Sequence, residues 1–203
     1  MPHFVTVATE DVVSEAVALR LLAEHPTALY PHKGPLGREG FGYLKANLDK
    51  FRAMARRHPV LLLTDLDRRT CAPGLITDWK GGKLLPPHLL FRVVVREVEA
   101  WLMADAEALR GFLSLASGRI PSRPEERLDP KADLIQICQM VKPKSFREEL
   151  VPEKGSTAKV GVGYNLHMVR FVRDHWDPAR AAEIAPSLAR ARRRLAELAA
   201  TAP

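Results

Sequence analysis

The spacing of apolar and polar residues changes several times along the first half of the chain. Four short apolar runs predict β-strands, at residues 3–8, 27–31, 60–64 and 89–95. Between them, apolar positions recur at helical spacing, which predicts helices at residues 12–24, in a basic segment ending near His58, at residues 75–79 and at residues 97–113, with a break near Asp105. Strands that alternate with helices are typical of a parallel α/β sheet with right-handed crossovers.

The second half of the chain has a different pattern. Prolines cluster after the midpoint, no further strand is predicted, and helical spacing recurs at residues 133–141 and 165–175, on either side of a loop at 151–164. The last predicted helix, which contains SLARARRRLAEL, places leucines on one side and arginines on the others. We therefore expect a Rossmann-like α/β core of about four strands at residues 1–115 and a helical C-terminal extension, packed on it, at residues 116–203.

Acidic side chains follow three of the predicted strands, at the point where each strand ends. The strand at residues 60–64 contains no charged residue, and two aspartates, two positions apart, come directly after it. Because parallel strands in an open α/β sheet end at the same edge, where ligands bind, acids that follow different strands meet there. The residues concerned are Glu10 and Asp11 after the first strand, Asp65 and Asp67 after the third, and Glu97 and Glu99 after the fourth.

A structural role is the competing explanation for each acid taken singly. Asp and Glu often follow strands because they cap the next helix or occupy its first turn. Asp11 or Ser14 suits the cap of the first predicted helix, and Glu97 suits the first turn of its own helix. An Asp-x-Asp pair together with an acid after the first strand nevertheless favours a site over a set of caps.

Several carboxylates in one place repel each other and raise one another's pKa values unless a cation is present. Hard divalent ions such as Mg²⁺ prefer oxygen ligands, and they often use one or two carboxylates together with waters and phosphates. Such an ion activates water and stabilises charge in phosphoryl transfer and phosphodiester hydrolysis. We therefore expect the acids at this edge to hold Mg²⁺ or Mn²⁺. Glu97 is preferred to Glu99 because it lies closer to the strand end.

An acid after the first strand, followed by Asp-x-Asp after a later apolar strand, resembles the TOPRIM domain of topoisomerases, primases and overcoming-lysogenization-defect nucleases. This resemblance covers residues 3 to about 105. The segments ATEDVVSEAVALRLL, LLLTDLDR, VREVEAWLMAD, GSTAKVGVGYN and PSLARARRRL are similar to parts of a bacterial family of TOPRIM-like proteins, over nearly the whole chain.

The resemblance implies a role for each acid. Glu10 would be the catalytic acid or base, and Asp65 and Asp67 would bind Mg²⁺. Glu97 is added to the metal site because of its position after the fourth strand, not because of the resemblance. TOPRIM domains usually carry a glycine immediately after the first acid, whereas Asp11 stands here, so Glu15 is retained as an alternative to Glu10. The resemblance also suggests a part in bacterial defence beside a separate ATPase, because GSTAKVGVGYN lacks the Walker spacing of a P-loop.

Basic side chains lie near the same edge. The chain carries 31 Lys and Arg against 24 Asp and Glu, a net charge of +7, which favours polyanionic partners. Nucleic acids are bound mainly through their phosphates, so basic residues beside the acids are candidate contacts, although a solvated basic surface is an equal alternative. The candidates are Lys33, Arg38 and Lys45, in and after the Gly-rich connection behind the second strand, and Arg68 and Arg69.

Cysteine usage and apolar run length suggest the cellular location. Cys71 and Cys138 are far apart and belong to no metal-type spacing, which suits a reducing compartment. No apolar run approaches the ~20 residues of a membrane span, and the N-terminus has no signal-peptide pattern. We expect a cytoplasmic protein that does not enter a membrane.

Three functions are compatible with these features. The first is a Mg²⁺-dependent nuclease or related phosphotransfer enzyme that acts on DNA or RNA. The second is a non-catalytic module that binds nucleic acid or a partner protein. The third is a small-molecule phosphatase that uses the same acids. The basic charge and the family resemblance favour the first.

Overall fold

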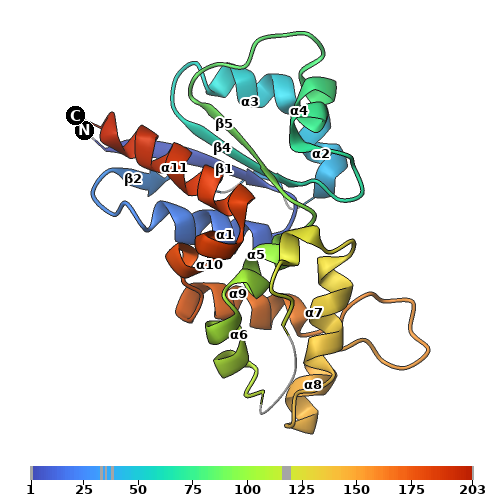
Figure 1. The fold of residues 1–203 in the computed structure, drawn as a ribbon. Helices are drawn as coiled ribbons and strands as arrows, with labels where there is room; N and C mark the ends of the chain where they lie inside the picture. Colours follow the sequence, from blue (N-terminus) through green and yellow to red (C-terminus); the bar gives the residue numbers. More distant parts are fainter. Residues whose placement is uncertain (1, 33, 35, 38, 116–119, 203) are drawn as a thin grey trace.

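The structure is a computed structural model that describes residues 2–32, 34, 36–37, 39–115 and 120–202. It shows a parallel β-sheet with helices on both faces, joined to a helical C-terminal half (Figure 1). The first half contains β1 (His3–Thr9), α1 (Val12–Leu22), β2 (Leu29–Pro31), β3 (Leu36–Gly37), α2 (Gly40–Ala46), α3 (Leu48–Met54), β4 (Val60–Asp65), α4 (Ala72–Lys80), β5 (Leu89–Val94), α5 (Val98–Ala104) and α6 (Ala106–Phe112). The second half contains the 3-10 turn η1 (Pro124–Glu126), α7 (Pro130–Cys138), α8 (Lys144–Leu150), α9 (Tyr164–Asp174), α10 (Pro178–Ile184) and α11 (Pro186–Ala200).

The order of the strands creates a topological switch point at the centre of the sheet. The order is β2-β1-β4-β5, all parallel, and β3 pairs with the carboxyl end of β1. The chain leaves β1 through α1 toward β2 on one side, and it leaves β4 through α4 toward β5 on the other side. The direction of winding therefore changes between β1 and β4. The carboxyl ends of two such strands are where open α/β sheets bind ligands.

Side chains of β4 alternate between two hydrophobic clusters, one on each face of the sheet. Leu61 and Leu63 belong to the cluster that contains α1 and the C-terminal helices, whereas Val60 and Leu62 belong to the cluster formed with α2, α3 and α4. None of these four side chains is more than 1% exposed. The uninterrupted apolar run is thus buried on both faces, and it fixes the position of the residue that ends the strand.

The main predicted elements of the first half are confirmed. The runs at residues 3–8, 60–64 and 89–95 form β1, β4 and β5, and the helix predicted at 97–113 breaks at Asp105 into α5 and α6. Asp105 is the N-cap of α6, where its carboxylate accepts a hydrogen bond from the backbone nitrogen of Ala108 at 3.3 Å. An α/β fold with a parallel sheet is therefore established.

Two predictions about the core are wrong. The sheet has five strands rather than about four, because Leu36–Gly37 forms β3, which is too short to show an alternating pattern. The single basic helix is two helices, α2 and α3, separated at Asn47. The Asn47 side chain donates a hydrogen bond to the carbonyl of Tyr43 at 2.9 Å, so it competes with the backbone for helical bonds at that point.

The helices of the C-terminal half share their hydrophobic core with the sheet. Trp101 of α5, Phe171 of α9 and Leu188 of α11 are fully buried and belong to the same cluster as Leu61 and Leu63. Helix α9 packs on α1, helix α10 on α5, and helix α11 on β5. No helix in the described part of the chain is both long and apolar enough to cross a bilayer.

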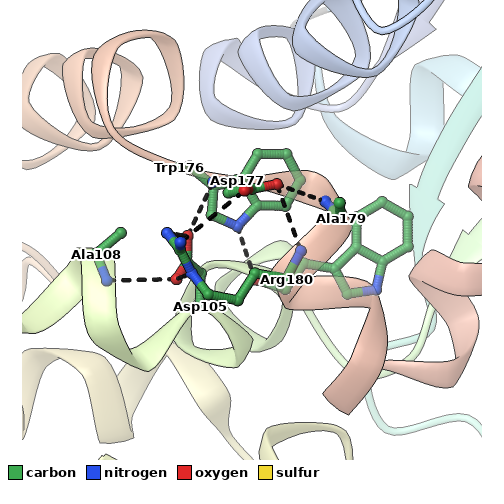
Figure 2. A network of polar contacts seen from close by, with 7 residues as sticks. Asp105, Ala108, Trp176, Asp177, Ala179 and Arg180 are labelled. Atoms are coloured by element: carbon green, nitrogen blue, oxygen red, sulfur yellow. Dashed lines mark hydrogen bonds and ion pairs between the residues drawn. The ribbon is translucent and has the colours of Figure 1, made fainter.

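A buried polar network fixes the C-terminal helices to the break between α5 and α6 (Figure 2). Asp105 is completely buried, and its two oxygens accept hydrogen bonds from Nε and Nη2 of Arg180, at 2.6 and 2.9 Å. The backbone nitrogen of Asp177 donates to Asp105 at 2.8 Å, and the indole of Trp176 donates to the carbonyl of Trp101 at 3.1 Å. This one carboxylate therefore joins α6 to the start of α10.

Candidate active site

Glu10 connects the ends of β1 and β4 at the position where the winding changes. Its Oε1 accepts a hydrogen bond from the backbone nitrogen of Asp65 at 2.9 Å, and a second from the hydroxyl of Thr64. Burial raises the pKa of Glu10, while these two hydrogen bonds oppose the rise. The acid after the first strand and the first aspartate after the third strand therefore lie in one site, as the sheet topology predicts.

Asp65 is more deeply buried than Glu10. It ends β4, it is 8% exposed, and burial raises its pKa well above the ordinary value. The nearby carboxylates of Glu99 and Glu10 raise this pKa further, whereas Lys131 opposes the rise. A carboxyl in such surroundings holds its proton more strongly than one in water, and an added cation would favour the ionised form.

The two glutamates after β5 take different positions. Glu97 is half-buried at the N-cap of α5, and its Oε2 accepts a hydrogen bond from the backbone nitrogen of Lys131 at 2.9 Å. Glu99, in the first turn of α5, is 1% exposed, and burial raises its pKa. Oε2 of Glu99 is buried without a hydrogen-bond partner. Glu99 also exerts the strongest effect of any carboxylate on Asp65, so it belongs to the site together with Glu97.

Lys131 and Tyr164 reach this site from the C-terminal half of the chain. The ammonium of Lys131, on α7, lies 3.3 Å from Oε1 of Glu99, and the hydroxyl of Tyr164, on α9, donates to the same oxygen at 3.1 Å. Burial alone would lower the pKa of Lys131, but the surrounding carboxylates, with Glu99 first, raise it above the ordinary value. Sequence reasoning missed both residues, because no local pattern shows that α7 and α9 approach the strand ends.

Asp67 lies in a backbone arrangement that the loop after β5 stabilises. Its φ is 51°, a left-handed conformation that is uncommon for residues other than glycine, and Arg96 in the neighbouring loop has a φ of 66°. The backbone nitrogen of Asp67 donates to the carbonyl of Arg96 at 2.8 Å, and the Arg96 guanidinium donates to the carbonyl of Asp67 at 3.0 Å. Conformations of this kind often occur at functional sites. The exposed carboxylate of Asp67 is thus placed at the solvent side of the site.

Two further acids follow Glu10. Asp11 is the N-cap of α1, where its Oδ1 accepts a hydrogen bond from the backbone nitrogen of Ser14 at 2.8 Å. This confirms the capping interpretation for Asp11. Glu15, the alternative to Glu10, is buried in the first turn of α1, one helical turn beyond the strand end.

The predicted basic contacts have different surroundings. Lys45 forms an exposed ion pair with Asp78 at 2.9 Å. The guanidinium of Arg69 lies over the ring of Phe41, 4.1 Å from its centre, and Arg68 is exposed. Lys33 and Arg38 lie outside the described residues. Arg68 is therefore the candidate whose charge is presented most directly to solvent beside Asp67.

The donors at this edge suit a hard divalent cation by their chemistry. They are carboxylate oxygens, burial raises the pKa of Glu10, Asp65, Glu97 and Glu99, and the buried Oε2 of Glu99 has no hydrogen-bond partner. Within the described ranges, no three His, Cys, Asp or Glu side chains form a group that could hold an ion. An ion at this edge would therefore have only one or two of these carboxylates as direct ligands, with water completing its coordination.

Comparison of the chain with protein-family models, with curated proteins and with solved structures found no match.

The raised pKa of Asp65 predicts that the stability of the folded protein decreases as the pH rises. Between the pKa of an unfolded Asp, about 3.9, and its higher pKa in the fold, the native protein holds a proton that the unfolded chain releases. The stability contributed by this group is therefore present at low pH and is lost through that window. We expect Asp65→Asn to unfold at a higher temperature than the wild type at pH 8, and the difference to shrink toward pH 4.

Thermal unfolding at a series of pH values measures this difference. Asp49→Asn is the matched control, because a hydrogen bond from Lys83 lowers the pKa of Asp49. Its contribution to stability develops between that lowered pKa and the unfolded value of about 3.9 and is constant at higher pH, so the difference in unfolding temperature between Asp49→Asn and the wild type should change little from pH 5 to pH 8. If the difference between Asp65→Asn and the wild type is equally constant over this range, the proposed environment of Asp65 is wrong.

Proposed function

We propose that this protein is a TOPRIM-like, Mg²⁺- or Mn²⁺-dependent nuclease or a related phosphotransfer enzyme that acts on nucleic acid. The observation that carries the proposal is the hydrogen bonding of Glu10, from the end of β1, to Thr64 and Asp65 at the end of β4. It brings an acid and an Asp-x-Asp pair from separate strands into one partly buried site.

The proposed division of roles follows from the surroundings of each acid. Glu10, whose pKa is raised by burial, is the proposed group that accepts or donates a proton. Asp65, Asp67 and Glu97 or Glu99 are the proposed acids of a divalent-ion site, in which one or two of them would bind the ion directly and the others through water; when bound, the ion would activate water and stabilise charge on a phosphate. Arg68, exposed beside Asp67, is the proposed contact to a nucleic acid backbone, and the net charge of +7 supports a polyanionic substrate.

The family resemblance supports one further element of this proposal, a separate ATPase that acts with the protein in bacterial defence. This partner is proposed by analogy with similar proteins. It would be tested by co-purification of an ATPase with the tagged full chain.

One observation favours a second function, a non-catalytic binding module. Lys131 already provides a positive charge 3.3 Å from Glu99, so the carboxylates have a counter-ion within the protein. With the negative charge of the carboxylates compensated in this way, the protein would stay folded without a bound metal ion. This function predicts that nucleic acid or partner binding is independent of divalent ions.

Cleavage assays separate these functions. The wild type and the double variant Asp65→Ala/Asp67→Ala would be incubated with single- and double-stranded DNA and RNA in Mg²⁺, Mn²⁺ or EDTA. We expect cleavage that requires a divalent ion and is lost in the double variant. A folded wild type that cleaves none of these substrates, but binds nucleic acid as well as the double variant does, would support the binding module. Turnover of nucleotides or phosphate esters alone would support the small-molecule phosphatase.

A further inference from the structure

A second candidate site lies in the helical half of the chain. A cavity of about 680 Å³ is lined by residues of α6, α8 and α9 and by the residue that follows α9. Its lining consists of Ala108, Gly111, Phe112, Phe146, His167, Arg170 and His175. In Figure 1, α6 and α8 lie at the opposite end of the molecule from α2, α3 and α4. None of the lining residues belongs to the carboxylate site at the strand ends, so the cavity is distinct from that site.

Aromatic rings form most of this lining. Phe112 contacts Phe146 edge-on, with 5.8 Å between ring centres, and it contacts the ring of His175 at 5.3 Å. Phe146 in turn contacts the ring of His167 edge-on at 4.8 Å. The four rings form one continuous series, and two small residues, Ala108 and Gly111, leave room beside them. Phe112 and Phe146 are half-buried rather than fully buried, so part of each residue is accessible to solvent.

The polar groups of the cavity favour an anion. Arg170, on α9, is exposed and lies in the lining, whereas no carboxylate is among the lining residues of the described chain. The imidazole of His167 is 2.5 Å from Oε2 of Glu149, and this contact holds the ring in place. The Arg170 guanidinium is therefore the cationic group best placed to meet a ligand, although the electrostatic influence of Asp174 also reaches it.

We propose that this cavity binds a nucleobase together with its phosphate. A flat aromatic ligand stacks on Phe and His rings, and guanidinium groups bind phosphate through parallel hydrogen bonds. The volume lies within the range of about 300–1,000 Å³ that is typical of small-ligand pockets. An aliphatic ligand would not account for four rings beside an arginine. The ligand is either a free nucleotide or one base of a single-stranded nucleic acid, and the proposal does not depend on catalysis at the carboxylate site.

Calorimetric titration of the full chain tests this proposal, with EDTA present so that divalent ions do not contribute. The ligands are AMP, adenosine, ribose 5-phosphate and a short single-stranded oligoadenylate. We expect AMP or the oligoadenylate to bind at least tenfold more tightly than ribose 5-phosphate, which has no base. Binding of AMP identifies a free nucleotide as the ligand, and binding of the oligoadenylate alone identifies a single strand. Weak and equal binding of all four ligands would overturn the proposal.

Variants assign the binding to this cavity. Phe146→Leu removes a ring but keeps an apolar side chain, and Arg170→Gln removes an exposed charge without disturbing the core. Each should weaken binding of the nucleotide about tenfold, as expected when one stacking or charge-assisted contact is lost. Arg170→Gln should leave adenosine, which has no phosphate, unaffected. Arg193→Gln, an exposed arginine of α11 outside this lining, makes the same change in charge and should bind like the wild type. Equal binding by Arg170→Gln, Phe146→Leu and the wild type would place the ligand elsewhere.

Discussion

Replacing Glu10 by glutamine is expected to reduce metal-dependent cleavage by about two to four orders of magnitude, the usual effect of losing a general acid or base. The glutamine oxygen retains the ability to accept the hydrogen bonds from Thr64 and from the backbone of Asp65, so the fold should remain intact. Initial rates on the best substrate in Mg²⁺, together with thermal unfolding of both proteins, measure the effect. The pH dependence of the remaining activity should also lose the ionisation that belongs to Glu10.

Glu15→Gln is the matched control for this substitution. It makes the same chemical change one helical turn beyond the strand end, in the first turn of α1. We expect Glu15→Gln to retain cleavage close to that of the wild type once the fraction of folded protein is taken into account. A large loss in Glu15→Gln with little change in Glu10→Gln would reverse the assignment of the two acids and would restore Glu15 as the proton-transfer group.

The meeting of Glu10 and Asp65 could be predicted from the sequence because it depends on a general property of parallel sheets. The apolar run before Asp65 indicates a strand buried on both faces, and parallel strands end at one edge. To place the two acids together, it was also necessary to know which strands are neighbours in the sheet. The order of the strands then follows from the parallel pairing of β1 with β4.

The remainder of the site depends on tertiary packing. Tyr164 is 65 residues from Glu99 in sequence, and it reaches that carboxylate because α9 packs on α1 beside α5. Lys131 approaches because α7 packs on α5. Helical periodicity shows which side of such a helix is apolar, but it does not show which element that side covers. For the same reason, the preference for Glu97 over Glu99 rested on sequence distance alone, whereas the burial of Glu99 is a property of the assembled core.

Arg180→Ala is expected to destabilise the protein by about 2 kcal/mol, because it leaves the buried carboxylate of Asp105 without its cationic partner. Breaking a fully buried ion pair costs about 3–5 kcal/mol, but the Arg180 side chain is 40% exposed, and water screens part of the interaction. The backbone nitrogens of Ala108 and Asp177 still donate to Asp105 in the variant. For a protein of this size, the change corresponds to a decrease of about 4–8 °C in the unfolding temperature.

Arg173→Ala is the matched control, because Arg173 forms a similar two-bond pair with Asp174 on the surface of α9. Both partners are in contact with solvent, so the loss of this pair should change the unfolding temperature little.

Denaturant unfolding followed by tryptophan fluorescence is a suitable measurement, since Trp101 and Trp176 are fully buried and Trp176 lies directly beside the network in Figure 2. If Arg180→Ala and Arg173→Ala unfold alike, Asp105 does not depend on its guanidinium partner. The attachment of α10 to the core would then rest on the hydrophobic contacts around Trp176 and Ala181 and on the backbone hydrogen bonds to Asp105.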